Sequence, residues 1–571
     1  MRILLLTQAF NSLTQRLFVE IRELEHEVSV EFDINNTVTS EAIKLFQPDL
    51  IIAPFLKRAI PASIWRRHVC LVVHPGIPGD RGPSALDWAV LEGKRRWGVT
   101  VLQANGEMDA GDIWAWSGFD MRTASKASLY RSEVTEAAVK AVTLAVQRFQ
   151  TGDFKPLSAN AGHPEIQGRP RPSMRQRQRA IDWQADETTL VLRKIRSADG
   201  FPGLRDEMLG RELYLYDAHA ENSIGGTAGE LVARCGAAVC RATTDGAIWI
   251  GHVRDKHSEH PFKLPATNLL ASEIEDLPEI EAGPDSGYRD IHYRQHGKVG
   301  YLYFSFYNGA MGTDQCKRLR RAYRDACQHD TRVIVLMGGP DFWSNGMHLN
   351  LIEASASSAD ESWRNINAID DLAAEIIQST SHITIAALRG NAGAGGVFLA
   401  RAADYVWAHK GVVLNPHYKD MGNLFGSEYW TYLLPRFAGK SHSKYIIESR
   451  LPMSGREARR HGLLDDTFGT GRTDFENQVA TRADRLANAA DFYHLLEKKR
   501  SRRSYDEDEK PLEAYRQEEL ENMKLNFYGF DPSYHVARYN FVYKTAKSRT
   551  PLTIASHRRK HGKLAALRSV S

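Results

Sequence analysis

Two short stretches of this chain carry residue types suited to acid–base chemistry. In 'CLVVHPGIPGDRG', His74 ends an apolar run that leads into a glycine- and proline-rich loop, and Asp109 follows later in 'ANGEMDAGD'. In 'LNPHYKDMGNLFGSEYW', Tyr418 precedes Glu428. A carboxylate in an apolar cleft has a raised pKa and can act as a general base beside a phenol that relays a proton. Taken alone, His74 could equally be a satisfied loop histidine and Glu428 a helix cap, so the surrounding elements must decide.

Length and composition limit those elements. A chain of 571 residues is too long for one hydrophobic core, and we expect three or four domains. Hydrophobic residues make up 42% and charged residues 25%, as in ordinary globular proteins. The 74 basic residues nearly balance the 70 acidic ones, which argues against nucleic acid or a membrane as the main partner. We therefore expect an α/β multidomain protein that acts on small molecules.

The cysteines and the apolar segments indicate where such a protein works. The five cysteines form no CxxC pair, and an odd, scattered set argues against a disulfide framework. The first residues, 'MRILLLTQAF', have the pattern of a β-strand rather than of a signal peptide. No stretch approaches the roughly 20 apolar residues that span a bilayer. These features predict a cytoplasmic protein.

The first 150 residues alternate short apolar runs with helical patterns, from 'RILLLT' and 'TQRLFVEIREL' to 'CLVVHPG' and 'WGVTVLQA'. This alternation predicts a Rossmann-like parallel sheet covered by helices on both faces. Ligands bind such sheets beyond the carboxyl ends of the strands. His74 is expected at a strand end there, and Asp109 in a turn between two strands.

This pattern resembles the catalytic domain of the 10-formyltetrahydrofolate-dependent formyltransferases. The resemblance lies in the strand ending in His-Pro, the Gly- and Ser-containing loop, the helix, 'GVTV', and Asp-x-Gly-x-Ile. It implies that His74 and Asp109 cooperate in moving a formyl group. The family also carries an asparagine two residues before the histidine as an oxyanion donor, and this chain has Val72 there. The acceptor or the details of transfer are therefore expected to differ.

The following segments predict a small domain and a linker. 'LVLRKIRSADGFPGL' resembles the segment that opens the second domain of the tRNA-type formyltransferases, and the strand-rich stretch after it predicts a small OB-like β-barrel. Residues 271–287 are acidic and rich in helix breakers, which is typical of a linker.

A second pattern begins after the linker. 'FWSNGMHLN' and 'IAALRGNAGAGGVFLARAADYVWA' lack the Gly-Lys-Ser/Thr of a phosphate loop, and Phe398 stands where GxGxxG needs its last glycine. Across roughly residues 290–470 the order resembles the crotonase (enoyl-CoA hydratase/isomerase) superfamily. The resemblance implies that the backbone N–H groups of Met347 and Gly395 hold a thioester oxygen. The plainer alternative is a helix-start turn packed on a sheet.

Departures from the crotonase pattern define the expected chemistry. The two glutamates of water-adding hydratases are replaced here by Phe398 and, approximately, His417. Tyr418 and Glu428 remain as the candidate acid–base pair, and Phe398, Trp343 and Tyr429 are expected to help keep the pocket dry. The sequence therefore argues against addition of water.

Formyltransferase-like and crotonase-like halves in one chain resemble the hydrogenase maturation factors of the HypX family, also called HoxX. The resemblance implies that a formyl group passes from 10-formyltetrahydrofolate to coenzyme A, and that formyl-CoA is split into CO and CoA. The CO becomes a ligand of the [NiFe]-hydrogenase iron, which makes hydrogenase maturation proteins candidate partners. No metal cofactor is expected. Two alternatives stay open, namely a formyl-CoA-forming or hydrolysing enzyme that yields formate, and a non-enzymatic scaffold that binds folate and CoA.

The same reasoning divides the chain and suggests contacts to CoA. The expected parts are a formyltransferase-like domain, a small barrel domain, a linker, a crotonase-like domain and a helical C-terminal extension, at residues 1–165, 166–270, 271–287, 288–490 and 491–571. CoA phosphates need cationic or N–H partners, and the candidates are Gln15, Arg16, Arg131, Ser197 and Arg450. Each of these could instead be a surface or structural residue. The extension is expected to cover the crotonase-like domain or to contact another subunit.

Overall fold

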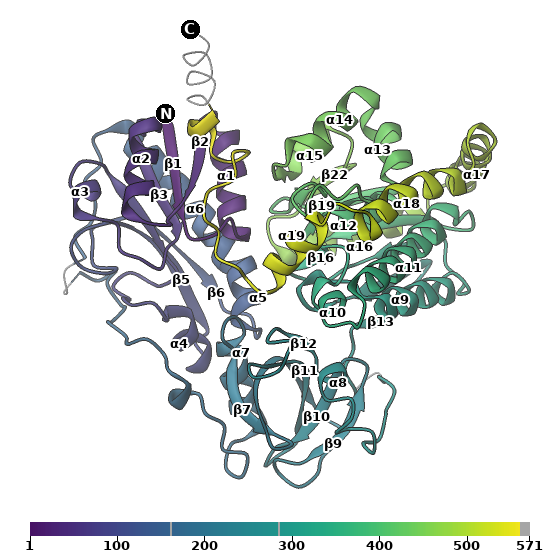
Figure 1. The fold of residues 1–571 in the computed structure, drawn as a ribbon, viewed down its shortest axis with the longest axis horizontal. Helices are drawn as coiled ribbons and strands as arrows, with labels where there is room; N and C mark the ends of the chain where they lie inside the picture. The colour runs from purple at the N-terminus through teal and green to yellow at the C-terminus, as the bar shows by residue number, and fades with distance from the viewer. Residues whose placement is uncertain (160–162, 284–285, 560–571) are drawn as a thin grey trace. The chain divides into compact units, whose positions relative to one another are not determined.

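The structure is a computed structural model that describes residues 1–159, 163–283 and 286–559, and its chain divides into two compact units (Figure 1). One unit comprises Met1–Tyr288 together with the chain from Ala546 on, and the other comprises Arg289–Thr545. Parts of the expected first domain, linker and C-terminal extension fall on residues 160–162, 284–285 and 560–571 and lie outside the described residues.

The first unit begins with a six-stranded sheet in the order β2-β1-β3-β4-β5-β6. Apolar strands such as 'RILLLT' are buried on both faces, as helix-covered strands require. The strands are β1 (Arg2–Thr7), β2 (Glu27–Phe32), β3 (Leu50–Phe55), β4 (Cys70–His74), β5 (Arg96–Gln103) and β6 (Ile113–Asp120). The helices are α1 (Ser12–Glu23), α2 (Asn36–Phe46), α3 (Ala62–Trp65), α4 (Ala85–Leu91), α5 (Lys126–Leu129), the π-helix η1 (Tyr130–Val134) and α6 (Thr135–Thr151).

The prediction of a wholly parallel sheet was wrong at one edge. β1 to β4 run parallel, but β5 pairs antiparallel with both β4 and β6. β5 and β6 are joined by a turn with no helix, which antiparallel strands allow and parallel strands do not. The last residues of β6 alternate between exposed and half-buried, as in an edge strand with one face to solvent.

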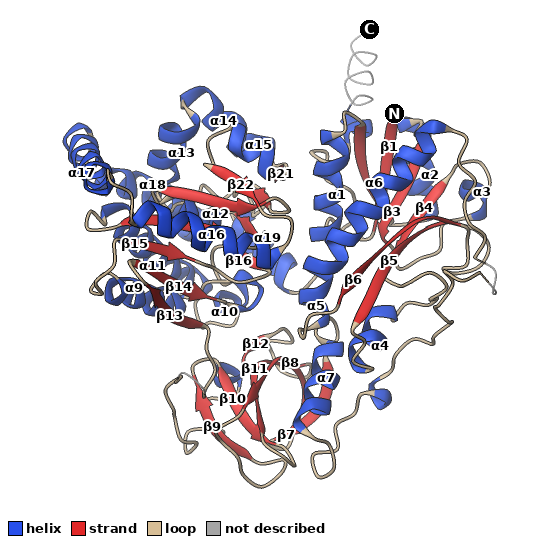
Figure 2. Ribbon diagram, turned by 180° about the vertical axis from the view of Figure 1, so that it is seen from behind, coloured by secondary structure: helices blue, strands red, loops and turns tan. Residues whose placement is uncertain are grey.

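A second, antiparallel sheet of the same unit curves round its own core, in the order β7-β8-β11-β10-β9 with β12 beside β11 (Figure 2). This agrees with the predicted small barrel domain. Its elements are η2 (Gln176–Gln178), α7 (Thr188–Ala198), β7 (Leu204–Met208), β8 (Arg211–Glu221), β9 (Leu231–Cys235), β10 (Ala238–Ala242), β11 (Ala247–Asp255), β12 (Leu264–Pro265) and α8 (Ala266–Leu269). Part of the expected linker packs here, because Ile274 is buried and Ile280 N–H donates to the Arg234 carbonyl at 3.0 Å.

The second unit contains a six-stranded sheet, β13-β14-β15-β17-β19-β22, and a smaller sheet, β16-β18-β20-β21. The strands are β13 (Ile291–His296), β14 (Val299–Phe304), β15 (Val333–Leu336), β16 (Phe342–Ser344), β17 (Ile383–Leu388), β18 (Asn391–Gly393), β19 (Tyr405–His409), β20 (Val413–Asn415), β21 (Met453–Ser454) and β22 (Asp466–Phe468). The helices before the extension are η3 (Tyr307–Gly309), α9 (Thr313–Ala326), α10 (Leu349–Glu353), α11 (Ser358–Gln378), α12 (Gly395–Arg401), α13 (Trp430–Ala438), α14 (Lys440–Ser449), α15 (Gly455–Arg460) and α16 (Arg472–Ala487). β16 and β18 lie side by side in parallel, which brings the two glycine segments together.

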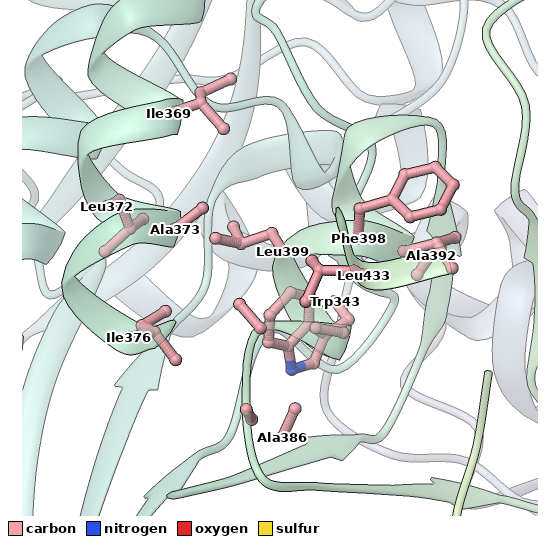
Figure 3. Close-up of a cluster of buried hydrophobic side chains, with 14 of the residues drawn as sticks. Trp343, Ile369, Leu372, Ala373, Ile376, Ala386, Ala392, Phe398, Leu399 and Leu433 are labelled. Atoms are coloured by element: carbon pink, nitrogen blue, oxygen red, sulfur yellow. The ribbon is translucent and has the colours of Figure 1, made fainter. Parts of the chain in front are cut away.

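Three further helices complete this unit: α17 (Phe492–Glu509), α18 (Leu512–Tyr528) and α19 (Ser533–Val542). α18 packs on α11 and α13 and carries Met523 and Phe527 into the core. Figure 3 shows part of that core, where Ile369, Leu372 and Ala373 of α11 face Leu399 of α12 near the Trp343 indole. The extension therefore forms part of the hydrophobic core of the second unit.

After α19 the chain returns to the first unit and lies along β2, where Figure 1 shows it in yellow. Val30 N–H donates to the Ile554 carbonyl at 3.0 Å, and Phe32 N–H donates to Thr550 Oγ1 at 2.8 Å. This segment covers an otherwise open sheet edge, a common protection against unwanted strand pairing.

Candidate functional sites

His74 lies at the carboxyl end of β4, as predicted, and its side chain is only 4% exposed. Its Nδ1 lies 3.4 Å from Asp109 Oδ2, and Asp109 occupies the turn between β5 and β6. Asp109 has a φ of 52°, an uncommon backbone angle for a residue with a side chain, and also accepts a hydrogen bond from Gly82 N–H at 3.1 Å. The turn therefore brings the predicted pair together and orients the Asp109 carboxylate toward the His74 ring.

A second carboxylate on His74 was missed from the sequence. Asp80 Oδ1 lies 3.1 Å from His74 Nε2, and Asp80 is buried. Arg171 Nε lies 3.4 Å from the other oxygen of Asp80. The available signal was an acid in the same glycine–proline loop, six residues after the histidine. With one carboxylate at each ring nitrogen, the imidazole is held in one orientation.

The loop after His74 is fixed by neighbouring strands and by a later segment. Trp97 Nε1–H donates to the Pro75 carbonyl at 2.9 Å, and Thr100 Oγ1–H donates to the Gly76 carbonyl at 2.8 Å. Gly168 N–H donates to the Pro78 carbonyl at 2.8 Å. Val72, where the related pattern has asparagine, lies on β4 between β3 and β5. The loop after His74 is therefore held in place, but the site has no side-chain amide at position 72.

The second site lies where the two glycine segments meet. A Cβ built on Gly346 would come 3.6 Å from the Gly395 nitrogen, so the residue before Met347 touches the start of α12. Gly395 is the first residue of α12, and N–H groups of a first helical turn have no acceptor within the helix. This arrangement fits two N–H groups converging on one oxygen, the predicted role of Met347 and Gly395.

Glu428 lies against the same glycine and is 1% exposed. A Cβ built on Gly395 would lie 1.9 Å from Glu428 Oε1, so only glycine leaves room for the carboxylate. Tyr418 Oη–H donates to Glu428 Oε2 at 2.7 Å, and Tyr418 Oη also lies 2.9 Å from the Ser427 carbonyl oxygen. The Tyr418 ring stacks on Phe398 with 5.6 Å between centroids. The predicted acid–base pair is therefore assembled in an aromatic, water-poor environment.

The environment of Glu428 favours its protonated form. Burial and the charge of Asp370 raise the pKa of Glu428 to about 8, and they outweigh the opposing hydrogen bond from Tyr418. Burial also raises the pKa of Tyr418 well above its usual value. A carboxyl group with a pKa near neutrality can accept a proton and return it within one catalytic cycle.

Two further buried acids surround Glu428 and were not predicted. Asp370 on α11 and Glu519 on α18 are both 0% exposed, and both bind the 427–431 segment through its N–H and hydroxyl groups. A signal was available in each helix, because an acid stands among apolar residues at helical spacing: Ile366, Ile369 and Ala373 around Asp370, and Leu512, Met523 and Phe527 around Glu519.

The five residues suggested for CoA binding lie on different elements of the two units. Gln15 and Arg16 lie on α1 and Arg131 lies on the π-helix η1, which packs against α1. Arg16 is already paired with Glu20 at 2.7 Å and Glu136 at 3.2 Å. Ser197 is buried at the end of α7 and donates to the Lys194 carbonyl at 2.8 Å, and Arg450 of the second unit donates to Asn423 at 2.8 Å. A role in CoA binding stays a prediction for all five.

The described residues contain neither a grouping of metal-binding side chains nor a membrane-spanning helix. Within them, no three His, Cys, Asp or Glu side chains are grouped in a way that could hold a metal ion. No helix in the described part of the chain is long and apolar enough to cross a bilayer.

Comparison with known proteins extends these findings. Three family profiles match: Formyl transferase over residues 23–146, Formyl transferase, C-terminal domain over 173–262, and Enoyl-CoA hydratase/isomerase over 310–527. The hydrogenase maturation factor HoxX of Bradyrhizobium diazoefficiens is 58% identical over 98% of this chain and 97% of its own. The crystal structure of HypX from Aquifex aeolicus in complex with tetrahydrofolic acid is 48% identical, with a TM-score of 0.94 over 98% of this chain and 99% of that chain. Methionyl-tRNA formyltransferase of Bacillus licheniformis is 23% identical over 32% of this chain and 58% of its own.

Proposed function

Because the chain belongs to the HypX/HoxX family of hydrogenase maturation factors, with formyltransferase and crotonase-like domains, we propose that it makes carbon monoxide in two steps. The first moves a formyl group from 10-formyltetrahydrofolate to the thiol of CoA. The second splits formyl-CoA into CO and CoA. The A. aeolicus relative was crystallised with tetrahydrofolic acid, which supports a folate donor for the first step.

In the first step His74 is the base and Asp109 and Asp80 hold it. The thiol proton passes to His74, the thiolate sulfur bonds to the formyl carbon, and the bond from that carbon to N10 of the folate breaks. The imidazolium then returns its proton to the leaving nitrogen. The two carboxylates support this role because they stabilise the imidazolium that forms transiently. Val72 offers no side-chain oxyanion donor, so other groups must stabilise the tetrahedral oxyanion formed in this step.

In the second step Glu428 takes the formyl proton. The C–H electron pair becomes the carbon lone pair of CO, and the C–S bond breaks with its electrons on sulfur. The same carboxyl group returns the proton to the thiolate, so formyl-CoA becomes CO and CoA with no other reactant. Met347 and Gly395 N–H groups are assigned to the carbonyl oxygen, because fixed donors need no reorganisation during the reaction.

The single observation that carries this proposal is the contact between Glu428 and Gly395. The Glu428 carboxylate fills the space where a Cβ of residue 395 would be. It therefore lies directly beside the Gly395 N–H, which is assigned to the substrate oxygen. A formyl group is small, so a donor and a base this close together can act on the same carbonyl group.

The environment of the site favours cleavage over hydrolysis. Phe398, Tyr418, Tyr429 and Trp343 are all buried in one hydrophobic cluster, in which Tyr418 contacts the Glu428 carboxylate and Phe398 stacks on Tyr418. Hydrolysis would need an activated water molecule in this space and would yield formate. A dry pocket leaves the formyl hydrogen as the group that an ionised Glu428 can reach.

The proposal is tested by supplying formyl-CoA directly and trapping CO with a haem protein. Wild type and His74→Ala should both release CO, because the supplied thioester bypasses the first site. Glu428→Gln should lose CO release by at least about 10²-fold, since it lacks a proton acceptor. Formate in place of CO from wild type, or equal CO release from Glu428→Gln, would reject the second step.

A further inference from the structure

The segment that presents Glu428 has an unusual backbone. Glu428 and Tyr429 both have φ near +60°, although residues with side chains avoid this region. Such a conformation is unfavourable for a residue with a side chain and persists only where its surroundings hold it. The hydroxyl groups on either side bind two buried acids: that of Ser427, just before, contacts Asp370, and that of Thr431, two residues after, donates to Glu519. The geometry of the base therefore depends on Asp370 and Glu519.

The contacts divide between the two acids. Asp370 Oδ1 accepts Glu428 N–H at 2.8 Å. Glu519 accepts Tyr429 N–H at 2.9 Å, Thr431 N–H at 2.8 Å and the Thr431 hydroxyl at 2.6 Å. Together they accept the N–H groups of Glu428, Tyr429 and Thr431, which lie just before and at the start of α13, where a negative charge is favoured.

Ser427 links the two acids. Its Oγ lies 2.7 Å from Asp370 Oδ2 and 3.2 Å from Glu519 Oε2. A hydroxyl has one hydrogen, and an ionised carboxylate can only accept. If both acids were ionised, one of the two contacts would set oxygen lone pairs against each other in a fully buried place. One of the acids must therefore hold a proton.

Other charges do not replace that proton. Glu428 and the phenols of Tyr418 and Tyr429 face the pair and add no positive charge. Arg516 on α18 is the nearby cation, and its charge lowers the pKa of Asp370, but its guanidinium pairs directly with Asp371 at 2.9 Å. The Cys316 thiol on α9 interacts with Glu428 and is neutral because burial raises its pKa. A proton on one of the two acids is therefore needed to reduce the buried negative charge of the pair.

We propose that Asp370 and Glu519 share one proton through Ser427, held on Asp370, and that this pair positions Glu428 for proton transfer. In this arrangement Asp370 Oδ2–H donates to Ser427 Oγ, and Ser427 Oγ–H donates to Glu519 Oε2. Every hydrogen then has an acceptor. Asp370 and Glu519 are positioning residues, since neither touches the substrate. The role in catalysis rests on the proposed function, but the shared proton does not.

Asp370 is chosen as the protonated acid because of the hydrogen bonds that Glu519 accepts. Burial raises the pKa of Asp370 to about 6 and that of Glu519 to about 8, so taken one at a time the proton would lie on Glu519. Glu519, however, already accepts three hydrogen bonds from Tyr429 and Thr431, which suit a carboxylate and leave little room for an acidic hydrogen. In coupled pairs the proton belongs to the pair and resides where the hydrogen bonds favour it.

The direct test is infrared difference spectroscopy, which needs no turnover and so stands even if the proposed reaction fails. The background is Glu428→Gln, which removes the other buried acid with a raised pKa in this site. At neutral pH this protein should show the C=O band of a protonated carboxylic acid, shifted by D₂O. Adding Asp370→Asn should remove the band. Adding Glu375→Gln, a carboxylate on the same helix that pairs with Arg320 and Arg324, should leave it unchanged.

Two results would overturn the proposal: no such band in Glu428→Gln, or the same band after Asp370→Asn. Ser427→Ala in the same background serves if Asp370→Asn fails to fold. It keeps both acids and removes the linking hydroxyl, so the frequency of the band should shift. An unchanged frequency would also contradict a proton shared through Ser427.

Turnover of supplied formyl-CoA tests the positioning role. Asp370→Ala should reduce CO release by about 10²-fold because the backbone N–H of Glu428 loses its acceptor. Asp370→Asn keeps that acceptor and can donate to Ser427, so it should retain about ten times the activity of the alanine variant. Equal losses in the two variants would show that Asp370 does not act through these two hydrogen bonds.

Discussion

Substitution of Gly395 by alanine should displace the proposed base without removing any polar group. The new Cβ would lie 1.9 Å from Glu428 Oε1 and 2.2 Å from its carboxyl carbon, whereas ordinary contact begins at 3.4 Å. The oxygen must therefore move by about 1.5 Å. A misplacement of about 1 Å at a reacting centre can reduce the rate about 10²-fold. We expect at least that loss in CO release, with a folding penalty of about 1–3 kcal/mol from overpacking.

The assay is CO release from supplied formyl-CoA, with thermal unfolding followed in parallel. Gly471→Ala in the same unit is the matched control, because a Cβ there meets no atom within 4 Å and the backbone is extended. It should leave CO release unchanged. Formation of formyl-CoA from the folate donor should survive in Gly395→Ala, since His74 lies in the other unit. A folded Gly395→Ala protein with wild-type CO release would refute the assignment of Glu428 as the base.

Three further predictions follow from particular contacts. Tyr418→Phe removes a hydrogen bond that favours ionised Glu428, so the pKa of Glu428 should rise above about 8 and the pH–rate profile of CO release should shift to higher pH; a shift to lower pH would contradict this. Asp80→Asn should slow formyl-CoA formation by about 10²-fold through His74 while cleavage of supplied formyl-CoA is unchanged, and loss of both activities would count against a separate first site. Glu31→Gln should lower the free energy of unfolding by about 3 kcal/mol at neutral pH, measured by denaturant unfolding, because His557 and Arg558 lose a buried partner. Burial raises the pKa of Glu31, but the hydrogen bonds from His557, Thr550 and Arg558 outweigh burial and lower it overall. The stability difference between wild type and Glu31→Gln should therefore shrink as the pH falls through this lowered pKa. A stability difference that stays constant with pH would refute this prediction.

The sequence predicted those parts of the fold and site that depend on local pattern. His74 at a strand end and Asp109 in a turn follow from apolar periodicity, which the structure confirms. Met347 and Gly395 could be singled out because their segments resemble the two oxyanion-hole segments of the crotonase superfamily, where glycine allows close backbone approach. The antiparallel direction of β5 was not predictable in the same way, because an apolar run does not reveal which way its strand runs.

The parts that the sequence missed depend on contacts between distant segments. Ser427 meets Glu519 92 positions away, and Glu31 meets His557 526 positions away. α18 was interpreted as a charged helix of an outer extension, and only its packing on α11 and α13 makes Glu519 part of the site. A buried acid at an apolar helix position is the one local signal that would have pointed to both Asp370 and Glu519.

The most direct test of the two-step account follows one labelled carbon through both sites. Purified protein receives CoA and 10-formyltetrahydrofolate with a carbon-13 formyl group, and a haem trap collects CO. Wild type should release labelled CO, Glu428→Gln should accumulate labelled formyl-CoA, and His74→Ala should form neither. Labelled formate without CO from wild type, unchanged in Glu428→Gln, would contradict the account.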